Sequence, residues 1–151
     1  MQALRHVIPP LAGKGDLAVD EGQLKRWGED LGASSSPPLV ISLTGELGTG
    51  KTTLAKAICA GYGVTEPVTS PTYAIVHRYS SPLSAVFHVD LYRLDDASQL
   101  TNIGWDELLT ERALVIVEWP ERAGDRLPGH HLHIELDYVP GEPEKRVLLA
   151  G

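Results

Sequence analysis

The sequence predicts a single α/β domain in which helices flank a central, mostly parallel sheet. Two apolar runs, residues 39–43 and 113–117, have the composition of strands that are covered on both faces. Between them apolar residues recur at helical spacing, and near the C-terminus they alternate as in a half-exposed strand. Such alternation of strand and helix patterns favours a parallel sheet. A chain of 151 residues has the usual length of one domain, so we expect residues 1–151 to form one unit.

The first predicted helix begins after Asp20, because an N-cap residue followed three positions later by Gln23 is a typical helix start. Apolar residues at helical spacing continue this helix to about residue 32. The apolar strand 39–43 then leads into a glycine-rich loop. A second helix follows the loop and ends near Gly63, which is a typical C-terminal stop.

The second half of the chain is predicted to hold a β-hairpin, two short helices and three more strands. The two hairpin strands are joined by serine and proline turn residues, and Gly104 interrupts the helical pattern. The last two strands are separated by a Pro-Gly turn. The predicted ranges are 73–80 and 85–91 for the hairpin, 95–110 for the two helices, and 113–117, 132–138 and 146–149 for the other strands.

Composition excludes several classes of function. A net charge of −7 argues against direct binding of nucleic acid, which needs clustered Lys and Arg. No apolar stretch reaches the ~20 residues of a membrane span, and residues 1–10 lack the pattern of a signal peptide. We therefore expect a cytoplasmic protein without a membrane partner. Cys59 is the single cysteine, which excludes an internal disulfide, and it is expected to be a buried packing residue.

The glycine-rich loop carries the strongest chemical signal. Gly45-Glu46-Leu47-Gly48-Thr49-Gly50-Lys51-Thr52 has the spacing of a phosphate-binding loop, and it lies between a buried strand and a helix as such a loop requires. Its glycines allow successive N–H groups to point at a phosphate, at the positive end of the helix. Lys51 would reach the β- and γ-phosphates, Thr52 would offer its hydroxyl to Mg²⁺, and Thr53 would contact the α-phosphate. The sequence therefore predicts a P-loop NTPase.

Two acids follow neighbouring apolar strands. Asp90 ends one predicted strand and Glu118 follows another, at the edge where open α/β sheets bind ligands. One of them is expected to hold Mg²⁺ and the other to position the attacking water, and the sequence leaves open which does which. Trp119 beside Glu118 is a further candidate for lining the site, although an aromatic residue there is as often part of the core.

Two other segments allow a functional and an ordinary interpretation. Residues 69–72, Thr-Ser-Pro-Thr, lie where many such enzymes sense the γ-phosphate, but they also have the composition of a turn. Residues 131–137 carry histidines and acids on one face of a strand, and these imitate a metal cluster. For them a solvated strand face is the favoured interpretation.

The motifs together resemble the TsaE (YjeE) ATPases of bacterial tRNA threonylcarbamoyladenosine biosynthesis. The resemblance runs from about residue 20 to the C-terminus, while residues 1–19 are less recognisable. Glu46, Thr49 and Tyr73 depart mildly from the family pattern without removing a functional group. The four matching stretches are residues 43–53, 68–73, 88–94 and 117–122.

The resemblance implies an ATPase that uses Mg²⁺ and works with the TsaB and TsaD proteins, so that it meets tRNA only indirectly through their complex. Lys51, Asp90 and Glu118 would be the catalytic residues, and Thr52 with Glu118 would hold the metal. The residues expected to bind ATP are Glu46, Leu47, Gly48, Thr49, Gly50, Lys51, Thr52, Thr53, Thr72 and Trp119.

Three functions remain open at this point. The first is a slow, partner-dependent ATPase that acts as a conformational switch in modifying the adenosine beside the anticodon. The second is a small-molecule or nucleoside kinase, for which residues 123–126 are the single short lid candidate. The third is an adaptor that binds nucleotide without turnover. ATP is favoured over GTP because the chain has no Asn-Lys-x-Asp segment to read guanine.

Overall fold

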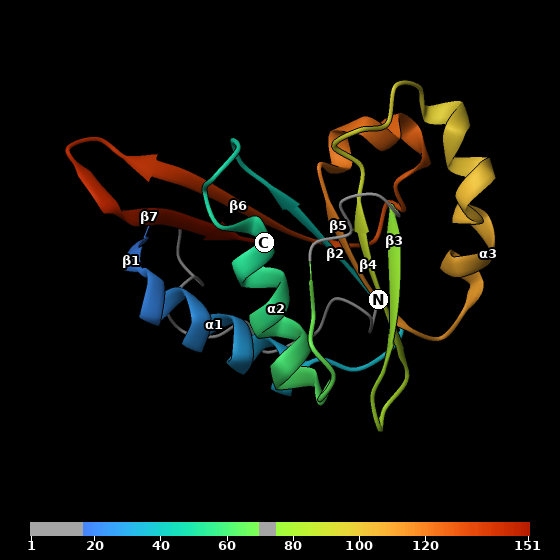
Figure 1. Ribbon diagram of the computed structural model, residues 1–151, viewed down its shortest axis with the longest axis horizontal. Coiled ribbons are helices and arrows are strands. Elements are labelled where there is room, and N and C mark those ends of the chain that lie inside the picture. The colour runs from blue at the N-terminus through green and yellow to red at the C-terminus, as the bar shows by residue number, and fades with distance from the viewer. Residues whose placement is uncertain (1–16, 70–74) are drawn as a thin grey trace.

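The computed structural model describes residues 17–69 and 75–151 (Figure 1). The strands are β1 (Leu17–Asp20), β2 (Leu39–Thr44), β3 (Val76–Ser80), β4 (Ala85–Asp90), β5 (Leu114–Glu118), β6 (Leu132–Val139) and β7 (Glu142–Ala150). The α-helices are α1 (Glu21–Ser34), α2 (Lys51–Tyr62) and α3 (Trp105–Thr110), and the 3-10 helical segments are η3 (Ala97–Ile103) and η4 (Pro120–Arg126).

The described residues form one sheet of seven strands in the order β1-β7-β6-β2-β5-β4-β3. The four inner strands, from β6 to β4, run parallel to their neighbours. The predicted parallel centre is present, but the sheet as a whole is mixed, because β3·β4, predicted as a hairpin, and the pairs β1·β7 and β6·β7 are antiparallel. In two of these pairs the strands are consecutive and are joined by a short turn, which permits only antiparallel pairing.

Helices α1 and α2 lie side by side against one face of the sheet (Figure 1). Their backbones approach so closely that a Cβ at Gly32 would lie 2.1 Å from the carbonyl oxygen of Ile58. A Cβ at Gly61 would lie 2.0 Å from the carbonyl oxygen of Glu29. Glycine is therefore required at both positions, and α2 is held firmly against α1 directly behind the glycine-rich loop.

The core has one part on each face of the sheet, because alternate residues of a strand point to opposite faces. Ile41 and Ile116 pack in the part that α1 and α2 cover. Val115 and Val117 pack in the other part, with side chains of η3, α3 and η4. Strand β5 is buried along its whole length, which explains why its sequence is one continuous apolar run.

Most predicted elements are confirmed. The capping box of α1 is present, since Asp20 accepts a hydrogen bond from the Gln23 backbone and donates its own N–H to the Gln23 side chain. The hairpin β3–β4 and the break at Gly104 are present as well, although the first of the two short helices is 3-10. Residues 73 and 74 of the predicted hairpin lie outside the described residues.

The sequence patterns missed strand β1 and the first half of β7. Residues 142–145 of β7 are polar and largely exposed, so they carry no apolar alternation. β1 is a four-residue strand that, among the described residues, lies at the sheet edge and pairs with β7 alone. In residues 17–69 and 75–151 no helix combines the length and the apolar character that crossing a membrane would need.

Candidate functional site

The glycine-rich loop (residues 45–50) connects the C-terminal end of β2 to the first residue of α2. Gly48 and Gly50 have φ angles of +83° and +110°, in the left-handed region that favours glycine. Thr49 stabilises the turn, because its backbone N–H and its hydroxyl both donate to the carbonyl oxygen of Glu46, at 3.2 and 2.8 Å. The loop thus places the positive end of helix α2 at the carboxyl edge of the sheet.

Lys51 is almost fully buried at the start of α2. Its Nζ donates to the carbonyl oxygens of Gly45 and Glu46, at 2.6 and 2.9 Å. The same ammonium lies 4.2 Å from the centre of the Trp119 ring. Burial lowers the pKa of Lys51, and the nearby carboxylates of Glu118, Asp90 and Glu121 act in the opposite direction. The ammonium is therefore fixed between the loop backbone, an aromatic ring and a group of acids.

Glu118 ends β5 and is 2% exposed. The hydroxyl of Thr52 donates to its two carboxylate oxygens, at 3.2 and 3.1 Å. The ring Nε2 of His88 lies 2.6 Å from Oε2 of the same carboxylate, and His88 itself is completely buried. The other ring nitrogen of His88, Nδ1, has no hydrogen-bond partner among the described residues. Glu118 is thus held from two sides, by β4 and by the first turn of α2.

Asp90 ends β4 and stands directly opposite Glu118 in the parallel register of β4 and β5. Its Oδ1 accepts a hydrogen bond of 3.0 Å from the backbone N–H of Tyr92. Burial is the main cause that raises the pKa of Asp90, and the charge of Glu118 raises it further. The Tyr92 hydrogen bond, His88 and Lys51 partly offset this rise. Two carboxyl groups therefore share one corner of the site, where the charge of Glu118 disfavours that of Asp90.

Trp119 directly follows Glu118 and begins the turn into η4. Its φ of +58° makes it the one non-glycine residue with positive φ in the described ranges. A left-handed conformation is costly for a bulky side chain, so the surrounding contacts must hold it. The ring is packed against Lys51 and against Tyr92, whose ring centre lies 5.0 Å away. The strained backbone turns an aromatic face onto the lysine of the loop.

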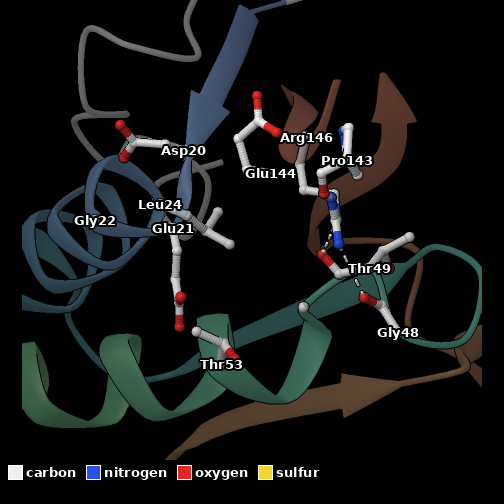
Figure 2. A pocket seen from close by; sticks show the side chains of 11 residues that line it. Asp20, Glu21, Gly22, Leu24, Gly48, Thr49, Thr53, Pro143, Glu144 and Arg146 are labelled. Atoms are coloured by element: carbon white, nitrogen blue, oxygen red, sulfur yellow. Dashed lines mark hydrogen bonds between the residues drawn. The ribbon is translucent and has the colours of Figure 1, made fainter. Parts of the chain in front are cut away.

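Among the cavities that adjoin the glycine-rich loop, two are also lined by Thr53 of α2. The inner cavity, of about 350 Å³, is lined by Lys51, Thr52, Asp90, Glu118 and Trp119 together with other residues of the loop. The outer cavity, of about 650 Å³, lies between the loop, the start of α1 and strand β7 (Figure 2). Gly48, Gly50 and Thr53 line both cavities, so the loop forms the boundary between them.

The structure brings most of the residues predicted for the site together. Lys51, Thr52, Thr53, Asp90, Glu118 and Trp119 line the inner cavity along with Leu47, Gly48 and Gly50. Glu46 and Thr49 belong to the loop but contribute carbonyl and hydroxyl contacts to its shape. Thr72, in the Ser-Pro-Thr segment, lies outside the described residues.

Sequence reasoning missed three residues of the site: His88, which contacts Glu118, and Tyr138 and Arg146, which contact the loop. His88 could have been found, because it lies two positions before Asp90 on the same strand and so shares its face. Tyr138 and Arg146 contact the loop from the C-terminal hairpin, more than 90 positions away in sequence. No local pattern indicates such a contact.

The histidines at and just before the start of β6 are engaged in the fold. His133 lies close to the hydroxyls of Ser42 and Thr44 on β2, at 2.8 and 3.2 Å from its two ring nitrogens. His131 bonds to the backbone carbonyl of Pro128. His133 is half-buried and not on a freely solvated face. Cys59 is buried as predicted, and burial raises the pKa of its thiol to about 12.

Comparison with known proteins places the chain in a family. The family described as threonylcarbamoyl adenosine biosynthesis protein TsaE matches residues 18–147. The chain belongs to the TsaE family. The match begins at β1 and ends within β7, so it includes every strand of the sheet and the whole site.

Individual TsaE proteins are similar over most of their length. The TsaE protein of Bacillus subtilis is 34% identical over 119 residues, which cover 79% of this chain and 73% of that protein. The TsaE protein of Mycobacterium tuberculosis H37Rv is 42% identical over 123 residues, which cover 76% and 70% of the two chains. The crystal structure of Bacillus subtilis YdiB matches with a TM-score of 0.73 and 27% identity, and covers 90% of this chain and 85% of YdiB. These likenesses support the sheet and helix arrangement described above.

Proposed function

We propose that this TsaE-family chain is a P-loop NTPase, a slow Mg²⁺-dependent ATPase that drives threonylcarbamoyl modification of the adenosine beside the anticodon in tRNA. The observation that carries the proposal is the contact between Thr52 and Glu118 beside the buried ammonium of Lys51. It joins the start of helix α2 to the carboxyl end of a neighbouring parallel strand. That is the combination of groups that phosphoryl transfer from a nucleoside triphosphate requires.

The glycine-rich loop would bind the phosphates. Its backbone N–H groups and the positive end of α2 favour negative charge, and Lys51 adds a full positive charge. In the present structure the ammonium is bonded to the carbonyls of Gly45 and Glu46. We infer that these bonds hold Lys51 at the loop until the β- and γ-phosphates replace the carbonyls as its partners. Thr53, which lines both cavities, would contact the α-phosphate.

The donor set suits Mg²⁺, a hard cation that prefers carboxylate, hydroxyl and phosphate oxygens. The hydroxyl of Thr52 lies within 3.2 Å of both carboxylate oxygens of Glu118, and Asp90 stands beside Glu118 on the next strand. We assign Thr52 and Glu118 as the residues that would hold the cation. Bound there with the phosphates, Mg²⁺ would neutralise charge that develops on the γ-phosphoryl group.

Asp90 would orient the attacking water. Its carboxyl lies in the inner cavity, and its raised pKa reflects a partly desolvated position next to Glu118. A hydrogen bond from the Tyr92 backbone fixes one of its oxygens, which leaves the other for a water molecule. Positioning and electrostatics would therefore supply most of the rate enhancement.

The outer cavity is the space for the nucleoside. It opens at Thr53 and the loop, where the α-phosphate would lie, and its other walls come from the N-terminal turn of α1 and from β7. Figure 2 shows Glu21 and Thr53 on one side of this space and Glu144 and Arg146 across from them. Its volume of about 650 Å³ falls within the usual range of small-molecule sites.

The structure does not support the lid that a kinase would need at residues 123–126. Residues 123–126 belong to η4, and Ala123 is completely buried in the core on that side of the sheet. A lid must open and close over the acceptor, which a segment anchored in the core does not readily do. An adaptor without turnover remains a distinct alternative, because it would use the same binding residues.

We further propose that the chain acts in the cytoplasm with the TsaB and TsaD proteins and meets tRNA only through that complex. The curated relatives are named tRNA threonylcarbamoyladenosine biosynthesis proteins, which supports a role in this modification. The net charge of −7 supports docking on protein partners, since it disfavours direct contact with tRNA. Purified TsaB and TsaD should be retained by the immobilised chain and released when ATP is withdrawn or hydrolysed.

The ATP proposal is tested by Lys51→Ala, with Lys56→Ala as the control. Both lysines lie on α2, but Lys56 is exposed and faces away from the inner cavity. In a calorimetric titration with Mg²⁺ and a nonhydrolysable ATP analogue, Lys51→Ala should bind at least 100-fold more weakly than the wild type, on the order of 3 kcal/mol. Lys56→Ala should bind normally. Retained affinity in Lys51→Ala would contradict the proposal.

A further inference from the structure

The C-terminal hairpin contacts the glycine-rich loop through Tyr138 and Arg146, and Arg146 also lines the outer cavity. The Tyr138 hydroxyl on β6 donates to the carbonyl oxygen of Leu47, at 2.5 Å. Arg146 on β7 donates through Nη2 to the carbonyl oxygen of Gly48, at 3.3 Å, and through Nε to that of Thr49, at 3.0 Å. Three successive carbonyl groups of the loop are thus bound by two side chains. Figure 2 shows the guanidinium of Arg146 directed at the loop.

The two side chains also hold each other in place. The guanidinium carbon of Arg146 lies 4.6 Å from the centre of the Tyr138 ring, where the cation and the aromatic face attract. Arg146 Nη1 donates to the carbonyl oxygens of Pro143 and Lys145, at 2.7 and 2.8 Å. The planar fork of the arginine therefore has little freedom to leave the loop.

The hairpin is a rigid support for these contacts. β6 pairs with β2 up to Thr44, the residue before the loop, and then continues alongside the loop itself. A Cβ at Gly45 would lie 2.5 Å from the carbonyl oxygen of Leu136, and one at Gly48 would lie 2.9 Å from the Tyr138 hydroxyl. The first half of the loop is therefore packed directly against the hairpin.

Carbonyl contacts of this kind decide where the amide N–H groups of a loop point. A peptide group is planar, so fixing its C=O on one side directs the N–H of the next residue to the other side. The carbonyls of Leu47, Gly48 and Thr49 belong to the peptide groups whose N–H groups are those of Gly48, Thr49 and Gly50. The N–H of Thr49 already donates to the Glu46 carbonyl, so the donors of the hairpin would orient the N–H groups of Gly48 and Gly50 toward a phosphate.

We propose that Arg146 and Tyr138 are positioning residues that hold the glycine-rich loop in its phosphate-binding shape before nucleotide arrives. The choice of ligand rests on the ATP-binding function proposed above, but the preorganisation of the loop does not. A preorganised loop binds more tightly because the ordering cost is met in folding. The two residues therefore act on nucleotide affinity, while the rate of the chemical step depends on groups in the inner cavity.

The test compares Arg146→Met, Arg146→Lys and Tyr138→Phe with the control Lys145→Met. Lys145 is the neighbour of Arg146 on β7, and its side chain pairs only with Glu142, at 3.8 Å, among the described residues. Amide hydrogen exchange of residues 45–50 is measured in the nucleotide-free protein. Affinity is measured by calorimetry with Mg²⁺ and a nonhydrolysable ATP analogue, and phosphate release gives kcat and KM.

We expect loop exchange to accelerate about tenfold in both Arg146 variants and about threefold in Tyr138→Phe, in line with the loss of two hydrogen bonds or one. Affinity for the analogue should weaken by similar factors, with kcat at saturating ATP within about twofold of the wild type. Lys145→Met should match the wild type in every readout. Tyr138→Phe deletes a single oxygen, so it carries the test even if an Arg146 variant does not fold.

Two results would overturn the inference. Unchanged exchange of residues 45–50 in Arg146→Lys and Tyr138→Phe would show that the contacts do not hold the loop. Weaker affinity for the analogue in an Arg146 variant without faster exchange of residues 45–50 would show that Arg146, which lines the outer cavity, acts by contacting the nucleotide directly. If exchange accelerates while the wild type binds no ATP, the proposed function fails and the positioning of the loop stands.

Discussion

Replacing Glu118 by Gln or by Ala separates its proposed role toward Mg²⁺ from its role in the fold. The carboxylate accepts from Thr52 and is bonded to the buried ring of His88 at 2.6 Å. A Gln keeps the size of the side chain and an oxygen that can accept from His88, but it removes the charge. An Ala removes both, and it leaves His88 with neither ring nitrogen bonded among the described residues, since Nδ1 already has no partner there.

The expected stability changes follow from these contacts. An orphaned buried donor costs about 1–3 kcal/mol, and the space left by the side chain adds to this, so Glu118→Ala should lose about 2–4 kcal/mol. Glu118→Gln should lose less than about 1 kcal/mol. For a chain of this size each kcal/mol lowers the Tm by roughly 2–4 °C, so the two variants should be clearly distinguishable in nucleotide-free thermal melts.

Phosphate release, unlike stability, should fall equally in both variants. Loss of a charged metal ligand should reduce phosphate release by about 100-fold or more in Glu118→Gln and in Glu118→Ala alike. ATP binding in the absence of Mg²⁺ should change little. The control is Glu121→Gln, which removes an exposed carboxylate that also acts on Lys51. Phosphate release that survives in Glu118→Gln would refute the metal assignment, and equal stability of the two variants would refute the buried His88 contact.

Three further predictions concern other parts of the chain. Asp90→Asn should raise the Tm at pH 7 while abolishing phosphate release. Because the folded-state pKa of Asp90 is raised, its contribution to the stability of the wild type is fully present below about pH 3.8 and is lost as the pH rises through the folded-state pKa. The gain in Tm should therefore vanish in melts at acid pH. Gly61→Ala should cost at least about 2 kcal/mol in urea unfolding, since its Cβ would meet the Glu29 backbone, and a neutral result would contradict the close helix contact. Cys59, with a pKa of about 12, should resist a thiol reagent at pH 8 in the native protein and react with one equivalent after unfolding.

The sequence predicted the elements whose contacts are local or whose burial is uniform. The capping box at Asp20 and Gln23 depends on residues three positions apart, and β5 is buried throughout, so each leaves a clear pattern. Asp90 and Glu118 were found because each ends an apolar strand, and parallel strands end at the same edge. The sequence does not indicate how strands that are distant in the chain pair with one another. The short β1 is defined by its pairing with residues 145–148 of β7, and the polar start of β7 is paired through Glu142 with Val139 of β6, which no window of sequence reveals.

Contacts between residues distant in sequence also escaped prediction at the site, on one side of the glycine-rich loop. The side of the loop that faces the inner cavity carries groups whose chemistry identifies them, such as Lys51 and Thr52. The opposite side is held by Tyr138 and Arg146, which are ordinary residue types in an exposed hairpin and become informative only through the carbonyls that they contact. A substitution in that hairpin is therefore expected to weaken the proposed nucleotide binding without touching any residue of the glycine-rich loop. The motif identifies which chemistry the loop can perform, whereas the distant hairpin determines how well the loop is prepared to perform it.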